Sequence, residues 1–415
     1  MRLMTTFLML TGALITGAFT GAAQAAETYH WVQYVPGGVE ARSISLGGEC
    51  PAAALDGVAA PMSVRSAPGV AYPILVCALA IPKGAVSASI ADVPLALPKA
   101  DPKRILLIGD TGCRLKGSVL QPCNDISQWP FRIGADVGAE LKPDLVIHVG
   151  DFHYRESTCP LSLRGCAGSP FGDSWDVWRA DFFAPADTLL NAAPWVFVRG
   201  NHEECDRGGK GWSRALDPYP FRSADGCLGL GQPFTADLGA VTLFVMDVST
   251  ADETKANAVQ AEFFRAQFAA TAALGDKPVW LAFHRPIWSA LEAGAGESGR
   301  DNRTLALAAR GAIAPNVQAI LSGHQHTFSV MSYVEDLPLQ IVSGNGGDDL
   351  DLTAPANPVG MVINGVTVNA GRGVPGRFGF SMLERDDEGW SVTDYDIHGT
   401  PLARCRLRGR AVACI

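Results

Sequence analysis

The sequence predicts an α/β domain preceded by a small β domain. After residue 103, short aliphatic runs alternate with segments whose apolar residues recur at helical spacing, as in an open sheet whose strands are joined by helices. Before residue 100, short apolar runs are separated by Gly, Ala and Pro, which is typical of strands joined by turns. We therefore expect three parts: a signal peptide over 1–25, a small N-terminal β domain over 26–100, and the main domain over 101–415.

The N-terminus has the features of a secretory signal peptide. Arg2 supplies a positive charge, residues 7–19 form an apolar stretch too short to span a bilayer comfortably, and Ala23-Gln24-Ala25 fits the small-residue cleavage rule. An uncleaved membrane anchor is the alternative. No later run is long and apolar enough to cross a membrane, so we expect an exported, soluble protein, secreted or periplasmic, without membrane contact after cleavage.

The elements of the two domains can be placed in order. In the small domain, apolar runs at 72–76 and 86–90 predict strands, and 95–102 reads as a linker. In the main domain, Pro130 is acceptable only in the first turn of a helix, so the first helix should begin near it. After residue 339 strands come densely, which suggests a closing antiparallel edge. The expected strands are 104–108, 145–149, 195–199, 241–246, 279–283, 319–321, 378–384 and 390–397, and the expected helices are 127–141, 256–273 and 302–313.

Composition excludes some functions. Apolar residues make up 47% of the chain and charged residues 18%, which is ordinary for a folded soluble protein and argues against disorder. The formal net charge of −9 offers no basic surface, so nucleic acid is not an expected partner. An anionic substrate would have to be attracted locally, by metal ions and a few arginines.

The cysteines agree with export. All 10 follow the predicted cleavage site, an even number, and none forms a Cys-x-x-Cys pair typical of a zinc ribbon or redox motif. Neighbours in sequence form closely spaced couples, which we expect to pin the loops that follow the metal-binding turns described next. The predicted pairs are Cys50–Cys77, Cys113–Cys123, Cys159–Cys166, Cys205–Cys227 and Cys405–Cys414.

Five short motifs place metal-binding residue types beside glycine or at the end of an apolar run. Because they follow strands, their side chains should meet at the carboxyl edge of the sheet. Alternate residues of an extended segment point the same way, so His324 and His326 can face one cavity. A single motif could be an ordinary turn or a core histidine, but the set indicates a site. The motifs are Gly109-Asp110-Thr111-Gly112, Gly150-Asp151-Phe152-His153-Tyr154, Gly200-Asn201-His202-Glu203, Leu281-Ala282-Phe283-His284 and Gly323-His324-Gln325-His326.

The donor types in these motifs suit two metal ions that share a carboxylate. Hard oxygen donors mixed with imidazoles favour iron, manganese or zinc over a closed structural zinc site of thiolates. The sequence therefore predicts a two-metal hydrolase. The candidate metal ligands are two carboxylates, a phenol, an amide and three imidazoles: Asp110, Asp151, Tyr154, Asn201, His284, His324 and His326.

Over about residues 103–345 the motif set resembles the calcineurin-like metallophosphoesterase superfamily, and within it most resembles the purple acid phosphatases. Most members carry Asp-x-His in the first motif, whereas this chain has Asp110-Thr111-Gly112. Tyr154 follows Asp151 by three residues, where purple acid phosphatases place a ferric-binding tyrosinate. The resemblance implies a sandwich of two mixed β-sheets flanked by helices, with 101–415 as the catalytic domain.

The resemblance also implies how the ligands divide. The bridging ligand would be Asp151. His153 competes with Tyr154 as a ligand, and otherwise it would orient its neighbours. The first ion, ferric iron, would be held by Asp110, Tyr154 and His326, and the second, divalent iron, zinc or manganese, by Asn201, His284 and His324.

Two adjacent ions would let a metal-bound hydroxide attack phosphorus directly, without a phospho-enzyme intermediate. His202, next to Asn201, is the candidate catalytic residue, contacting phosphoryl oxygens or protonating the leaving group. Alternatively, His202 orients a ligand and is itself held by Glu203.

The chain departs from the better-known purple acid phosphatases after His284, because the loop that follows has no further histidine. An arginine in this loop could take the place of the missing histidine, although each candidate arginine is more simply a solvated surface charge. Asp348, Asp349 and Asp351 could bound the pocket or bind a cation, but a solvated loop is the simpler expectation. Asp247 is expected to be structural or to support a ligand. The candidate arginines are Arg285, Arg300 and Arg303.

These observations lead to one hypothesis and two alternatives. The leading one is an exported phosphatase that hydrolyses small phosphomonoesters. A phosphodiesterase acting on nucleotides or lipid head groups would share the same motifs, and only the walls of the pocket would distinguish it. A non-catalytic protein that binds phosphate esters through the metal pair is the third. The natural substrate, the oligomeric state and the role of the N-terminal domain are left open by the sequence.

Overall fold

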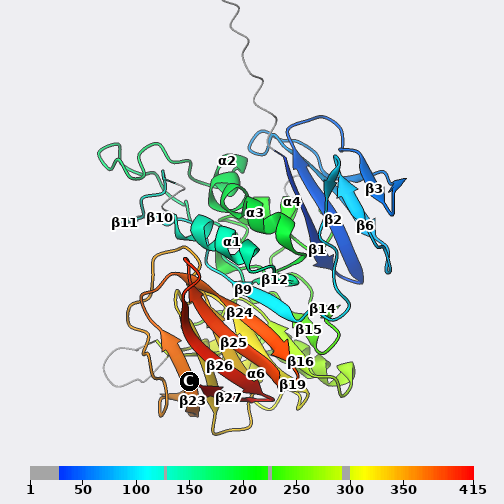
Figure 1. The fold of residues 1–415 in the computed structure, drawn as a ribbon. Helices are drawn as coiled ribbons and strands as arrows, with labels where there is room; N and C mark the ends of the chain where they lie inside the picture. Colours follow the sequence, from blue (N-terminus) through cyan, green and yellow to red (C-terminus); the bar gives the residue numbers. More distant parts are fainter. Residues whose placement is uncertain (1–27, 126–128, 223–226, 292–299) are drawn as a thin grey trace, which may run out of the picture.

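Two large β-sheets pack face to face, and helices cover both outer faces (Figure 1). The computed structural model describes residues 28–125, 129–222, 227–291 and 300–415, so the predicted signal peptide lies outside it. Between the sheets, Ile105 and Leu107 of the first pack into one buried cluster with Leu243 and Leu321 of the second. The predicted sandwich of two mixed sheets flanked by helices is confirmed.

The first sheet is built around three predicted parallel strands. β9 (Arg104–Ile108) pairs with β12 (Leu145–His148), and β12 pairs with β13 (Trp195–Phe197). All three are buried on both faces, which explains their nearly continuous apolar sequences. β12 and β13 end slightly earlier than predicted because the Gly-Asp and Gly-Asn-His segments leave the sheet to form turns.

Helices that follow these strands cover the outer face of the first sheet. The first begins at Pro130 as predicted, because a proline at the start of a helix loses no hydrogen bond there. The segment 175–192 is helical although no helix was predicted for it. Its Pro185 lies in the first turn of a helix that continues directly from a π-helical turn. The elements are α1 (Pro130–Glu140), α2 (Trp175–Trp178), η1 (Arg179–Phe183), α3 (Ala184–Ala192), η2 (Asn201–Glu203) and α4 (Gly209–Ala215).

The second sheet has a parallel centre that includes the predicted strands 241–246, 279–283 and 319–321. α5 (Ala258–Ala270) and α6 (Arg303–Ala309) cover its outer face, and η3 (Thr271–Leu274) continues α5. The side chains of Asn257 and Asn302 accept backbone N–H bonds at the first turns of α5 and α6, which sets where each helix begins. The strand order is β14 (Phe234–Asp237), β15 (Thr242–Val245), β16 (Val279–Ala282), β19 (Val317–Ser322), β21 (Leu339–Ser343), β20 (Phe328–Tyr333), β23 (Val366–Val374) and β22 (Val362–Ile363).

The N-terminal β region extends the first sheet. β1 pairs in parallel with β13 through Gln33 and Trp195, so this region and the main domain share one continuous sheet. Trp31 and Ile74 also belong to the buried cluster formed with α1 and α3. The boundary near residue 100 stays a prediction. The strands are β1 (Tyr29–Val35), β2 (Gly38–Ser45), β6 (Leu75–Ile81) and β5 (Ser63–Ser66), beside a small sheet of β4 (Val58–Ala59), β3 (Ala53–Leu55), β7 (Ala88–Ile90) and β8 (Val93–Pro94).

The C-terminal strands complete the other edge of the first sheet, antiparallel to β9 and to one another, as predicted. They are β24 (Gly379–Asp386), β25 (Gly389–Asp396), β26 (Pro401–Arg408) and β27 (Ala411–Cys414). Two short hairpins lie outside the main sheets: β10 (Leu115–Lys116) with β11 (Val119–Leu120), and β17 (Trp288–Ser289) with β18 (Arg300–Asp301).

Disulfides join the cysteines in the predicted pairs. All five pairs are present, and no cysteine is free. Three of the bridges lie in loops that follow the first three motifs. Five disulfides suggest an oxidising environment. Among the described residues, no helix combines the length and the apolar character needed to span a membrane.

Candidate metal centre

The predicted ligands come together at the carboxyl ends of the central strands of both sheets. Asp110 follows β9, Asp151 follows β12, and Asn201 begins the short helix after β13. His284 follows β16 of the second sheet, and the His324–His326 segment follows β19. Five of the seven predicted ligands are buried, and the two C-terminal histidines are half-buried. Both sheets therefore contribute to a single site at one edge of the sandwich.

The turns that present these side chains are strained and tightly packed. Asp110, Asp151 and His324 have positive φ values of 56°, 59° and 70°, which costs non-glycine residues roughly 1–3 kcal/mol each. The preceding glycines leave no space for a side chain. A Cβ on Gly200 would lie 2.0 Å from Oδ1 of Asp151, and one on Gly323 would lie 2.5 Å from Oδ2 of Asp110. The glycines thus allow the close approach that the motifs predicted.

One group of donors surrounds the phenol of Tyr154. Its hydroxyl oxygen lies 2.9 Å from Oδ1 of Asp110, 3.0 Å from Oδ2 of Asp151 and 3.1 Å from Nε2 of His326. Burial raises the pKa of the Tyr154 phenol well above its ordinary value, and the carboxylates of Asp110 and Asp151 raise it further. A phenolate at this position therefore requires positive charge close by.

A second group of donors surrounds His284. Its Nε2 lies 3.0 Å from Oδ2 of Asp151 and 3.1 Å from Oδ1 of Asn201. The ring of His324 lies beside it, with the ring centres 5.1 Å apart. Ligand atoms of Asp151, His284 and His324 all lie within 4.8 Å of one another. The same oxygen of Asp151 thus touches both groups.

The two histidines of the last motif reach the centre by a turn and not by strand alternation. The positive φ of His324 bends the chain directly after β19, so the predicted extended segment is wrong. The backbone N–H of His324 donates to Oδ2 of Asp110 at 2.8 Å. His324 faces His284, whereas His326 faces Tyr154. One short segment therefore supplies both donor groups.

Each histidine of the centre has a partner on its other ring nitrogen. Nδ1 of His284 lies 2.8 Å from the backbone oxygen of Val149, and Nδ1 of His326 lies 2.5 Å from that of Asp349. Nε2 of His324 lies 2.8 Å from Oε2 of Glu253. Such partners fix the tautomer and orientation of metal-binding histidines. Glu253 was not predicted, because no motif surrounds it in the sequence.

Glu203 supports the second motif instead of holding His202. Its carboxylate accepts backbone N–H bonds from Asp151, Phe152 and His153 at 2.8–3.1 Å, and from Gly200 at 3.0 Å. This buried carboxylate therefore fixes the turn that presents Asp151. The alternative role, in which Glu203 orients the imidazole of His202, is wrong.

His202 lies against the centre within a polar cluster. Its ring lies against that of Tyr154 with the centres 3.9 Å apart and the planes tilted by 37°, and its Nε2 lies 3.8 Å from Oδ2 of Asp151. Nδ1 lies 2.8 Å from Oε1 of Glu156, and Nη2 of Arg207 lies within 2.8 Å of both ring nitrogens. Burial lowers the pKa of His202 to about 4, although Asp151 and Glu156 act in the opposite direction. Sequence motifs gave no signal for Glu156 or Arg207.

Three other expectations can be compared with the structure. The imidazole of His153 points away from the donors, with its Nε2 2.9 Å from the backbone oxygen of Gly172. Asp348 is buried and hydrogen-bonded to Arg114, so the prediction that it lies in a solvated loop is wrong. Arg285 is also engaged: its Nε donates to the backbone oxygen of Ser249, and its guanidinium pairs with Glu253. Arg303 is exposed, and the side chain of Arg300 lies outside the described part.

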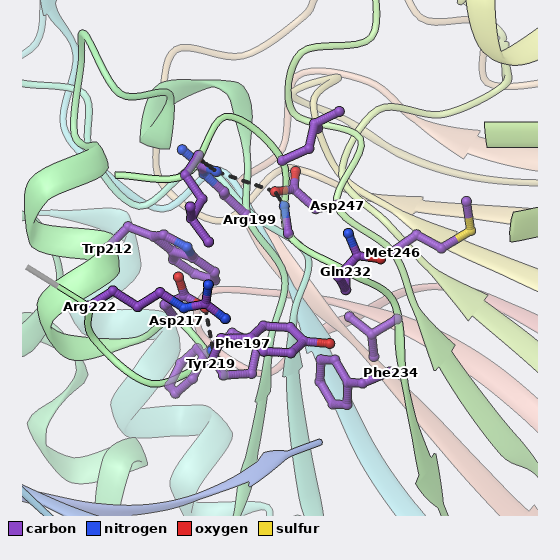
Figure 2. Close-up of a pocket in the computed structure, with 15 residues that line it drawn as sticks. Phe197, Arg199, Trp212, Asp217, Tyr219, Arg222, Gln232, Phe234, Met246 and Asp247 are labelled. Carbon is purple, nitrogen blue, oxygen red and sulfur yellow. Dashed lines mark hydrogen bonds and ion pairs between the residues drawn. The ribbon is translucent and has the colours of Figure 1, made fainter. Parts of the chain in front are cut away.

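A separate cavity of about 340 Å³ lies next to β13, α4 and β15 (Figure 2). Asp247 pairs there with Arg199 at 3.3 Å and accepts the backbone N–H of Gly231, which agrees with its expected structural role. The aromatic part of its wall comprises Phe197, Trp212, Tyr219 and Phe234 (Figure 2). None of the seven predicted ligands is among the lining residues, so the cavity is distinct from the centre.

The donor set fits metal ions. Because Nδ1 of His284 lies against the backbone oxygen of Val149, the neutral ring presents an unprotonated Nε2 to the oxygens of Asp151 and Asn201. The single proton of the Tyr154 hydroxyl likewise faces carboxylate oxygens of both Asp110 and Asp151, so acceptors outnumber protons, as expected where cations are held. The oxygen-rich group around Tyr154 suits a hard cation, and the imidazole-rich group around His284 suits a borderline divalent one.

Comparisons with known proteins agree with this architecture. The sequence profile of the calcineurin-like phosphoesterases matches residues 103–328. The purple acid phosphatase PPD1 from seeds of yellow lupin (Lupinus luteus) superposes with a TM-score of 0.56 at 13% identity, covering 91% of this chain and 74% of that one. A structure of PhoD superposes with a TM-score of 0.54 at 10% identity, covering 94% and 91%. No curated protein matches the chain in sequence.

The profile match spans more than half of the 415 residues and includes all seven predicted ligands. At such low identities, the two structural similarities show the fold alone. Together with the profile match, this fold supports metal-dependent hydrolysis of phosphoesters and implies binding of divalent metal. The chain belongs to the calcineurin-like phosphoesterase family.

Proposed function

We propose that the protein is an exported phosphatase that hydrolyses small phosphomonoesters at a pair of metal ions. The observation that carries this proposal is the position of Asp151. Its Oδ2 lies 3.0 Å from the Tyr154 hydroxyl and 3.0 Å from Nε2 of His284, which is where a carboxylate shared by two cations would lie. The five disulfides support export to an oxidising compartment, outside the cell or in the periplasm.

The two donor groups define the two proposed ion sites. The phenol and the carboxylates suit ferric iron, whereas the neutral amide and imidazoles leave the other ion divalent: iron, zinc or manganese. Asp151 belongs to both. The first site comprises Asp110, Tyr154 and His326, and the second comprises Asn201, His284 and His324.

When bound, a metal pair supplies Lewis acidity toward the phosphoryl group and activates water for in-line attack. The residues of the chain hold and orient the reactants. The Nε2 of His202 lies on the Asp151 side of the centre, and we assign it to contact with a phosphoryl oxygen or protonation of the leaving oxygen. The carboxylate of Glu156 and the backbone oxygen of His153 hold the His202 ring at its other nitrogen, Nδ1.

One preparation of the mature protein tests the proposal. Elemental analysis should find two metal ions per chain, and iron bound to Tyr154 should give a violet charge-transfer band. The protein should hydrolyse an aryl phosphate monoester faster than the matching aryl diester. Removal of the ions with a chelator should abolish turnover, and their return should restore it.

Each alternative has a distinct outcome. Hydrolysis of the diester alone would identify a phosphodiesterase. Two bound ions with phosphate binding but no turnover would identify a binding protein. A colourless active protein would replace the iron with zinc or manganese. A Tyr154→Phe variant that keeps both iron and colour would remove Tyr154 from the ligand set.

A further inference from the structure

Arg114 lies four residues after Asp110 in a loop that is fixed from several sides. Its backbone N–H donates to Oε1 of Gln121 at 2.6 Å, and Nε2 of Gln121 donates to the backbone oxygen of Gly347 at 3.1 Å. The preceding residue, Cys113, is bonded to Cys123. The position of the Arg114 backbone is therefore set by contacts other than those of its own side chain.

The Arg114 guanidinium forms a forked ion pair with Asp348. Nε lies 3.0 Å and 2.9 Å from the two carboxylate oxygens, and Nη2 donates to Oδ2. The Asp348 carboxylate is fully buried, and its Oδ2 lies 3.3 Å from Nδ1 of His326. Because Nε2 of His326 lies 3.1 Å from the Tyr154 hydroxyl, the ion pair orients this imidazole from behind.

The same guanidinium lies over the ring of Tyr154, with its central carbon 5.0 Å from the ring centre. A cation at this distance is attracted by the negative face of the aromatic ring. One side chain thus contacts Tyr154 directly and His326 through Asp348.

We propose that Arg114 is a positioning residue for the Tyr154 and His326 end of the metal centre, where its guanidinium lies over the Tyr154 ring and its ion pair with Asp348 fixes the His326 imidazole. The inference rests on the proposed function only in requiring a metal ion beside Tyr154. Arg114 would contact neither the substrate nor the reacting atoms. A merely structural ion pair would contribute to folding stability, but it would leave the electronic state of the phenolate unchanged.

Two variants separate the effect of the Arg114 charge from the effect of its forked ion pair with Asp348. Arg114→Met keeps a long stem without charge, and Arg114→Lys keeps the charge without the forked contact to Asp348. Arg132→Met is the matched control, because Arg132 forms an ion pair with Asp136 on α1, away from the donors. For each purified variant we would measure folding by circular dichroism, the wavelength of the charge-transfer band, and metal retained against increasing chelator.

In Arg114→Met the band should shift to longer wavelength, because a phenolate without its cation gives up an electron more easily. Metal affinity should fall by about 10–100-fold, the usual effect of losing an outer partner of metal ligands. Arg114→Lys should keep the band near its original wavelength while losing affinity, and Arg132→Met should change neither property.

A folded Arg114→Met protein with unchanged band and unchanged metal retention would overturn the inference and leave the proposed function intact. If the wild-type protein is colourless, the affinity comparison alone decides, and equal retention by the variant overturns the inference. If the wild-type protein binds no metal, the proposed function fails and the inference fails with it. These results are distinguishable because none depends on measuring turnover.

Discussion

The Nε2 atom of His284 lies 3.0 Å from Oδ2 of Asp151. His284 comes from the second sheet and Asp151 from the first, so this contact joins the two halves of the sandwich at the centre. Another contact of the same oxygen, with the Tyr154 hydroxyl, stays within the loop that follows β12 of the first sheet. Asp151 is therefore the residue whose loss should disturb both donor groups together.

Asp151→Asn tests this position. The amide keeps the shape of the side chain but removes its negative charge, so we expect loss of bound metal and a fall in kcat of at least about 10²–10³-fold, as when a preorganised charge-stabilising group is removed. Metal content and turnover would be measured on the same preparation. Asp247→Asn is the control, since Asp247 is also buried but pairs with Arg199 away from the donors. An Asp151→Asn protein with full metal content and activity would exclude a bridging role.

His202→Asn tests the proposed catalytic residue. The backbone N–H of His202 donates to Oδ1 of Asp151 at 2.8 Å, and this contact does not involve the His202 side chain. We therefore expect metal content to be kept while kcat falls by about 10²–10⁴-fold, the range for general acid–base catalysis. Alkyl phosphates should lose more than aryl phosphates, because a poor leaving group depends more on protonation.

His153→Asn is the matched control for this variant. The His153 imidazole is bonded to the backbone oxygen of Gly172 and points away from the donors, so activity should change little. Equal losses on aryl and alkyl esters in His202→Asn would indicate phosphoryl binding without proton transfer. No loss on either ester would exclude His202 from both roles.

The sequence predicted the parts of the site that depend on local pattern. An apolar run that ends in Gly-Asp, as at Asp110 and Asp151, predicts both a buried strand and a carboxylate at its carboxyl end. The turn at His324 was not predicted, because histidine is enriched among non-glycine residues with positive φ but adopts it too rarely for the residue type alone to identify the turn. Its ring nevertheless reaches the centre, because Gly323 allows close approach to Asp110.

Features that depend on distant partners could not be predicted. Burial of Asp348 follows from its pairing with Arg114, 234 positions away in sequence. The continuity of the N-terminal strands with the first sheet depends on one register between Gln33 and Trp195, which no local pattern specifies. The same limitation explains why Glu253 was missed, since only folding brings it to His324.

Removal of the Cys113–Cys123 disulfide should weaken metal binding, whereas removal of the Cys405–Cys414 disulfide should not. The Cys113–Cys123 and Cys405–Cys414 bridges span 10 and 9 positions, so losing either should cost a similar free energy of unfolding, about 2–4 kcal/mol. Only the first adjoins Arg114 and the turn of Asp110. The double serine variant of the first pair should retain less metal against a chelator at a temperature where both variants are folded. Equal retention would show that this bridge supports stability alone.

The last prediction concerns Asp394, a carboxyl group buried in β25 outside the metal centre. Burial raises its pKa well above the ordinary value of 3.8, more than the neighbouring side chains of Asn345 and Ser381 lower it. Folding therefore keeps this group protonated. Above pH 3.8 the unfolded chain releases the proton and the folded chain retains it, so stability falls as pH rises until the folded pKa is passed.

Asp394→Asn removes this titration while keeping a neutral side chain of the same size. The variant should gain stability relative to the wild type as pH rises, by up to about 1.4 kcal/mol per pH unit. Thermal unfolding at several pH values would measure this difference, and subtraction of the wild-type curve cancels the pH dependence of the metal centre.

Asp396→Asn on the same strand is the control. Burial raises the pKa of Asp396, but hydrogen bonds from the Thr400 and His398 backbone outweigh it and lower the pKa below its ordinary value. Replacing Asp396 should therefore reduce stability above pH 3.8, the opposite of the effect expected for Asp394. If the difference in stability between Asp394→Asn and the wild type stayed constant as pH rises above 3.8, Asp394 would be ionised in the folded protein.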